Sequence, residues 1–155
     1  MEPTLLLDSY LRQLRLPTFA RNYQQFATDA ARSNQDYTRF LLALAEQEIA
    51  QREQHRIQRR IKMARFPVLK ELADFDFAML PSLHKAKVLD LAQGAYIVQR
   101  EPILMVGNPG VGKTHLAIGL ALAACRQGHK VRFFTAARLV NELIQAQDTH
   151  RLHSF

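Results

Sequence analysis

The sequence predicts an α/β protein, in which an N-terminal α-helical domain precedes the first part of a parallel-sheet module built around a phosphate-binding loop. Two observations lead to this fold class. Glycine and proline are absent between Asp36 and Phe66, which is typical of one long helix. From Ile103 onward the pattern is strand, glycine-rich loop, helix, strand, helix, and this order is typical of a parallel sheet with helical crossovers.

Three amphipathic helices are expected before residue 67. Apolar residues recur every three or four positions from Pro3 to about Arg15, and Pro17 ends this first pattern. We expect Thr18 to cap a second helix that stops at residues 33–35, and Asp36 to cap a third of about 28 residues. Residues 1–66 are therefore predicted to form a helical domain.

Residues 67–102 are expected to form a connector and one helix. Pro67 closes the long helix, and Phe75 and Phe77 stand at the spacing of a strand. Since two exposed phenylalanines would be costly, we expect this connector to pack on the domain that follows. Ser82 can cap a helix that ends near Gln99.

A phosphate-binding loop is expected after the first predicted strand, residues 103–106. Its spacing is Gly-x-x-x-x-Gly-Lys-Thr, the Walker A pattern, and its glycines let backbone N–H groups point at phosphate oxygens. Lys113 would bind the β and γ phosphates of a nucleotide, and Thr114 would ligate Mg²⁺. A chance match is the alternative, which the apolar strand before the loop and the helical pattern after it oppose. The predicted site comprises Gly107, Asn108, Pro109, Gly110, Val111, Gly112, Lys113 and Thr114.

The C-terminal part completes the strand and helix order. Gly128 is expected to end the helix that starts near Lys113. Residues 131–135 are predicted as a second strand and residues 136–147 as a further helix.

Composition indicates an acidic partner. The chain has 155 residues, a net charge of +7 and one cysteine, Cys125. Nucleic acid is the commonest partner of so basic a protein, and a lone cysteine predicts a reducing compartment. Apolar runs are too short for a membrane span and the N-terminus lacks a secretion signal, so we expect a cytoplasmic protein that contacts no membrane.

A basic stripe is predicted on the long helix. Its arginines fall at steps of four, three and one, which gathers them within roughly 100° of the helix circumference. Such a row suits the phosphates of a DNA backbone and gives affinity without sequence choice. The alternatives are a solvated helix face and a contact between subunits. The predicted DNA-binding residues are Arg52, Arg56, Arg59 and Arg60, with Lys62 and Arg65 beside them.

Nearly the whole chain resembles a known family. Residues 51–67, 74–77 and 107–117 are similar to the IstB-like ATP-binding proteins, transposition helpers of insertion sequences that are related to the DnaC helicase loader. The resemblance implies an N-terminal helical domain and an AAA+ ATPase module, with ATP and Mg²⁺ held by residues 107–114. It also implies ATP-dependent assembly on DNA and delivery of a partner, a transposase in one group and a replicative helicase in the other. A homo-oligomer of this chain is a further expectation.

The chain departs from this family in its catalytic parts. An AAA+ module also needs an acidic strand end, a sensor and an arginine finger, whereas only Glu142 and Asp148 supply carboxylates after Thr114. We therefore expect ATP hydrolysis to be very slow or absent, and residues 103–155 to form a truncated module of marginal stability. Two other functions stay open: a DnaC-like helicase loader, and a nonenzymatic DNA-binding or interaction module with a vestigial loop.

Overall fold

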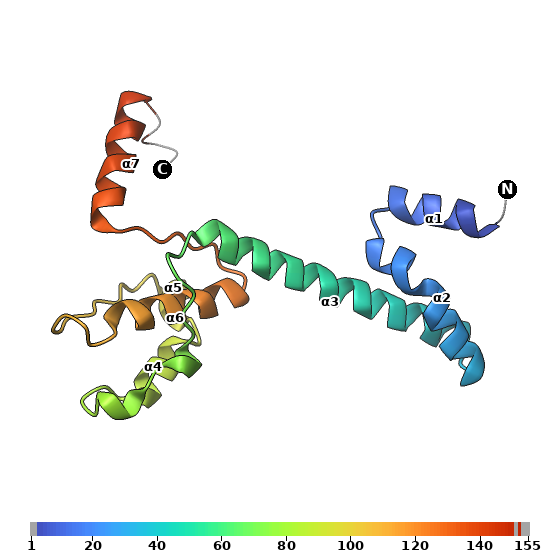
Figure 1. Cartoon of the computed structure of the whole chain (residues 1–155), viewed down its shortest axis with the longest axis horizontal. Helices are drawn as coiled ribbons and strands as arrows, with labels where there is room; N and C mark the ends of the chain where they lie inside the picture. Colours follow the sequence, from blue (N-terminus) through green and yellow to red (C-terminus); the bar gives the residue numbers. More distant parts are fainter. Residues whose placement is uncertain (1–2, 151, 153–155) are drawn as a thin grey trace. The chain divides into compact units, whose positions relative to one another are not determined.

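The computed structural model describes residues 3–150 and 152 and divides the chain into two compact units. Unit 1 is Met1–Gln58 and unit 2 is Arg59–Phe155. Figure 1 labels their helices, and the helix α3 contributes residues to both units. Each unit is a compact body of its own.

Unit 1 consists of α1 (Pro3–Gln13), α2 (Pro17–Arg32) and the first part of α3 (Tyr37–Ala64). The expectation for α3 is confirmed, since this helix has 28 residues and the Asp36 carboxylate accepts a hydrogen bond from the Arg39 N–H at 2.8 Å. The expectation that Thr18 caps α2 is wrong. Proline needs no partner for a backbone N–H, so Pro17 opens the helix and Thr18 lies inside it.

A buried carboxylate ties α2 to α3 within unit 1. Glu48 is 4% exposed and accepts a hydrogen bond from the Thr18 N–H at 2.9 Å and one from Arg52 Nε at 2.6 Å. Burial raises the pKa of Glu48, but the hydrogen bonds from Arg52 and Thr18 outweigh this and leave it below its ordinary value. Glu48 is therefore ionised, and its charge satisfies a backbone donor in the first turn of α2.

Unit 2 is arranged around α6 (Lys113–Arg126), whose buried residues include Leu116, Ile118 and Cys125. The short helices η1 (Leu72–Asp74), η2 (Phe77–Met79), α4 (Lys85–Leu91) and α5 (Ala95–Gln99) precede it. The helix α7 (Ala136–Asp148) follows, and the Thr135 hydroxyl accepts a hydrogen bond from the Arg138 N–H at its start.

The connector packs on α6, as the sequence predicts. Phe75 and Phe77 contact each other edge to face, with ring centroids 4.9 Å apart, and lie against the cluster of Val88, Leu116 and Leu120. Instead of a strand, the connector forms two short 3₁₀ turns, with Phe75 and Asp76 in extended conformation between them and Phe77 at the start of the second turn.

The expectation of a single helix after Ser82 is wrong. Two helices, α4 and α5, occupy this segment, and His84 rather than Ser82 precedes the first of them. Gly94 takes a left-handed conformation with φ of 82° between them. A residue in this region of φ ends an α-helix, so the helical pattern is interrupted there.

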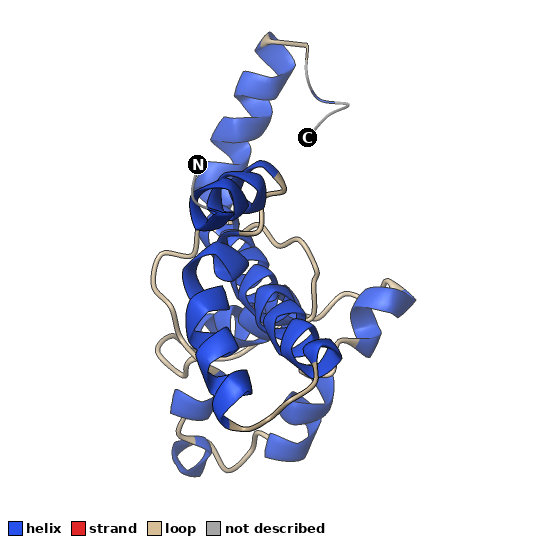
Figure 2. Cartoon of the chain, turned by 90° about the vertical axis from the view of Figure 1, so that its right-hand side faces the viewer, coloured by secondary structure: helices blue, strands red, loops and turns tan. Residues whose placement is uncertain are grey.

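The prediction of a parallel sheet is also wrong. Residues 3–150 and 152 form helices, turns and loops, with no strand among them (Figure 2). A strand needs a backbone partner, but Leu104 and Val106 are 86% and 95% exposed and the Phe133 N–H donates to the Ala64 carbonyl at 2.8 Å. Residues 103–106 and 131–135 are therefore not paired with each other, and the fold is helical.

None of the described helices combines the length and the apolar character that a membrane crossing requires.

Candidate phosphate-binding loop and basic surfaces

Two glycines shape the loop before α6. Gly110 and Gly112 have φ of 82° and 88°, a left-handed conformation that favours glycine. A Cβ at Gly112 would lie 2.6 Å from Cε2 of Phe75, whereas one at Gly110 would meet no atom within 4 Å. The loop is thus pressed against the core at Gly112 and open at Gly110.

The side chain of Lys113 closes the loop on itself. Its Nζ donates hydrogen bonds to the carbonyl oxygens of Gly107 at 2.7 Å and Asn108 at 2.6 Å. Gly112 is the N-cap of α6 and supplies no side chain, so no side chain caps the first turn. Lys113 is the first residue of α6, so its ammonium group is bonded within the loop that leads into an uncapped helix start, and both features favour an anion.

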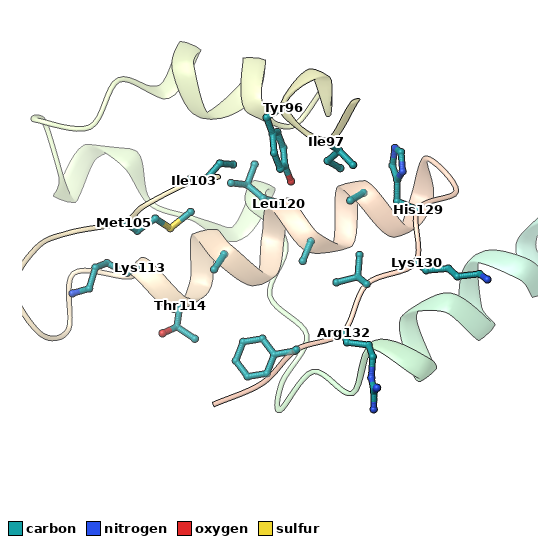
Figure 3. A pocket seen from close by; sticks show the side chains of 15 residues that line it. Tyr96, Ile97, Ile103, Met105, Lys113, Thr114, Leu120, His129, Lys130 and Arg132 are labelled. Carbon is teal, nitrogen blue, oxygen red and sulfur yellow. The ribbon is translucent and has the colours of Figure 1, made fainter. Parts of the chain in front are cut away.

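An open groove of about 650 Å³ extends from this helix start along α6. Lys113 and Thr114 lie at one end and His129 and Lys130 at the other (Figure 3). Its lining also includes four residues of α6 and two of α5, together with residues of the segments 103–106 and 131–135. These are Ala117, Leu120, Ala121 and Ala124, then Tyr96 and Ile97, then Ile103, Met105, Val131, Arg132 and Phe133.

The size of the groove falls in the range of small-molecule sites. Burial raises the pKa of Tyr96, so its phenol is neutral and able to donate a hydrogen bond. Sequence reasoning missed Tyr96, His129 and Lys130, because none belongs to a local motif and only the packing of α5 and residues 129–133 on α6 brings them to the groove.

The predicted basic residues in unit 1 are already paired. Arg52 bonds to Glu48 and donates from Nη2 to the Arg15 carbonyl oxygen. Arg56 Nη1 lies 3.2 Å from Glu53 Oε2 in an exposed ion pair. Arg52 therefore has a structural role that the sequence pattern did not indicate.

The predicted basic residues of unit 2 have different surroundings. Arg60 lies near Gly128. Burial raises the pKa of Cys125, and the positive charge of Arg60 lowers it again in part. Arg65 follows the end of α3 and pairs with Glu142 at 3.9 Å. Arg59 and Lys62 are exposed on α3, and neither forms an ion pair with another of the residues 3–150 and 152.

Comparison with known proteins adds a family to this geometry. The sequence profile of the family described as IstB-like ATP binding protein matches residues 9–155. The chain is 36% identical over 146 residues to a protein of Geobacillus stearothermophilus named for ATP binding in insertion sequence IS5376. It is 35% identical over 146 residues to the corresponding protein of insertion sequence IS21 from Pseudomonas aeruginosa. A relative from Sinorhizobium fredii is 39% identical over 149 residues.

The matches cover most of this chain and a smaller share of each relative. They include 94% of the chain and 58% of the Geobacillus protein, 94% and 55% for Pseudomonas, and 96% and 50% for Sinorhizobium. The chain thus spans about half the length of the curated relatives it matches. Since the family profile covers the loop, α6 and α3 together, the chain belongs to the family of IstB-like ATP binding proteins.

Proposed function

We propose that this protein binds ATP together with Mg²⁺ at residues 107–114 and takes part in the transposition of an insertion sequence. The observation that carries the proposal is the Lys113 ammonium, which bonds to the Gly107 and Asn108 carbonyls in a loop that contains two left-handed glycines and leads into the uncapped start of α6. The names of the relatives, which refer to ATP binding and insertion sequences, support it.

The residues of the loop fit a polyphosphate. Phosphate oxygens are stronger acceptors for an ammonium group than the carbonyls of Gly107 and Asn108, so a bound nucleotide would draw Lys113 away from them. The first-turn N–H groups of α6 would donate to the same anion. All eight residues from Gly107 to Thr114 belong to the proposed site.

A single hydroxyl suffices for the metal. Mg²⁺ keeps several waters and takes only one or two protein ligands, with phosphate oxygens completing its shell. Thr114 is exposed in the groove, one residue after Lys113, and would supply that ligand. The metal would neutralise part of the phosphate charge.

We propose binding rather than rapid hydrolysis as the role of ATP in this chain. Glu142, on α7 of unit 2, is one carboxylate that could act as a base. Three arginines surround Glu142, and a carboxylate held in this way is a poor base for activating water. ATP would then serve assembly on DNA.

DNA and a transposase are the proposed partners, with further copies of this chain. The net charge of +7 supports DNA. Of the predicted contacts, Arg59 and Lys62 are exposed on α3, and Arg65 is 58% exposed and held only by a 3.9 Å ion pair with Glu142. Arg52 is held by the buried Glu48, and Arg56 and Arg60 interact with other parts of the protein. We propose the cytoplasm as its location, because the one cysteine, Cys125, precludes a disulfide within the chain.

Isothermal titration of the chain with ATP and Mg²⁺ tests the nucleotide site. Lys113→Ala should weaken binding about 10- to 100-fold, since a hydrogen bond to a charged group contributes about 1.5–3 kcal/mol. Lys130→Ala, which removes a lysine from the far end of the same groove, is the matched control and should bind nearly as wild type.

Two substitutions at Thr114 test its role as the Mg²⁺ ligand. Thr114→Val should reduce ATP binding in Mg²⁺ to the level that wild type shows in EDTA, whereas Thr114→Ser should keep the dependence on Mg²⁺.

Equal affinities for wild type and Lys113→Ala would contradict the proposed site.

A further inference from the structure

Three arginines from separate segments of unit 2 surround one carboxylate. Oε1 of Glu142 lies 3.1 Å from Arg138 Nε and 3.9 Å from Arg65 Nη1. Its Oε2 lies 3.4 Å from Arg132 Nη2. We call Arg65, Arg132, Arg138 and Glu142, together with Phe134, the arginine cluster. It lies within unit 2, so its geometry does not depend on unit 1.

An aromatic ring holds two of the guanidinium groups. The Cζ atoms of Arg132 and Arg138 are 5.0 Å and 5.9 Å from the ring centroid of Phe134. At these distances the ring quadrupole attracts both cations. Phe134 therefore restricts the rotamers of both side chains, which lowers the entropy lost when they bind an anion.

The charges of the cluster do not balance. The residues that define the cluster include three guanidinium groups and one carboxylate, so together they carry a net charge of two positive. The arginine side chains are 40–58% exposed, whereas that of Glu142 is 23% exposed. Ion pairs this accessible to water are weak, so an external anion can compete with Glu142 for the guanidinium groups.

We infer that the arginine cluster binds the phosphodiester backbone of a nucleic acid. The inference rests on the proposed binding to DNA and adds to it a contact formed by residues 132–138 with Arg65. Guanidinium groups match phosphate oxygens with two parallel hydrogen bonds, and several held together suit consecutive phosphates of one strand. In Figure 3 the side chain of Arg132 extends away from α6, toward the outside of the groove.

The test is the salt dependence of binding to a short fluorescent DNA duplex, measured by anisotropy on the full chain. The double variant Arg132→Gln and Arg138→Gln should bind at least about tenfold more weakly at low salt. Its slope of log affinity against log salt should be flatter by about two units, because each phosphate contact contributes about 0.9.

Two controls separate charge from structure. Arg126→Gln removes an arginine of the same unit that pairs one to one with Glu71, and it should leave the slope unchanged. The double variant Arg132→Lys and Arg138→Lys keeps both charges and should keep most of the slope. The thermal unfolding midpoint of each variant shows whether its fold is intact.

A second measurement looks for a variant that binds DNA more tightly than wild type. Glu142→Gln raises the net charge of the cluster by one, so it should bind DNA more tightly and with a steeper slope. An unchanged or weaker affinity would contradict the inference, as would equal slopes for wild type and the double glutamine variant. If wild type itself does not bind DNA at low salt, the proposed DNA function fails as well, and the two failures are thus distinguishable.

Discussion

The two predicted sites are distributed differently on their helices, at one end of α6 and along the length of α3. On α6 the proposed functional groups are confined to Lys113, Thr114 and the loop before them, and much of the rest of the helix is buried. On α3 the basic residues are spread along the helix, and acidic neighbours such as Glu48 and Glu53 pair with some of them. A site formed by consecutive residues thus depends on local backbone geometry, whereas a charged surface depends on which side chains the fold places beside it.

The largest effect is expected at Gly112. Gly112→Ala places a Cβ at φ of 88° and against Phe75, so strain of about 1–2 kcal/mol and overpacking of about 1–3 kcal/mol should both lower the free energy of unfolding. Thermal or urea unfolding of the nucleotide-free protein measures it. Gly110→Ala is the matched control, because it shares the left-handed φ but meets no neighbouring atom, and it should lose less. Equal losses would show that Phe75 does not press on the loop.

Gly119 tests the packing of η1 on the buried part of α6. A Cβ there would lie 2.6 Å from Cδ2 of Leu72, so Gly119→Ala should destabilise unit 2 by about 1–2 kcal/mol despite the better helix propensity of alanine. Urea unfolding measures the loss. In a Leu72→Ala background the same substitution should cost less, and additive losses in this double-mutant cycle would contradict the contact.

A substitution at Glu48 tests the hydrogen bonds that join α3 to α2 within unit 1. Glu48→Gln should cost about 1–3 kcal/mol at neutral pH, because it removes a buried charge that accepts hydrogen bonds from Arg52 and Thr18. The folded state lowers the pKa of Glu48 below its ordinary 4.5, so its stabilisation is present above that pH and is lost as pH falls through the lower, folded value.

The measurement is the difference in unfolding free energy between wild type and Glu48→Gln, which should shrink in acid. Glu46→Gln, an exposed neighbour on the same helix, should show neither the loss nor the pH dependence. A constant difference between pH 7 and pH 3 would contradict the assigned cause.

The smallest effect is expected for single basic residues of α3. Lys62→Gln should flatten the salt slope of DNA binding by about one unit, whereas Arg52→Gln should change it little, since Arg52 is engaged by Glu48 and Arg15. Anisotropy titrations at several salt concentrations measure both slopes. A larger change for Arg52 than for Lys62 would reverse this ranking of the predicted contacts.

Local signals predicted much of the secondary structure and failed where a neighbour intervened. Asp36 caps α3 as expected because the interaction spans only three residues. Thr18 does not cap α2, because Pro17 already opens the helix. The pattern after Ser82 concealed the break at Gly94, since the apolar residues on both sides kept a helical spacing.

The sequence by itself determined the phosphate-loop motif, the bounds of the long helix and the excess of positive charge, since each depends on residue type and short-range spacing. Only the tertiary structure decided that residues 103–106 and 131–135 do not pair, that Arg52 is held by Glu48, and that three arginines gather at Glu142. Pairing of backbones and of charges joins residues far apart in the chain, and a periodic pattern carries no information about which distant group will be the partner.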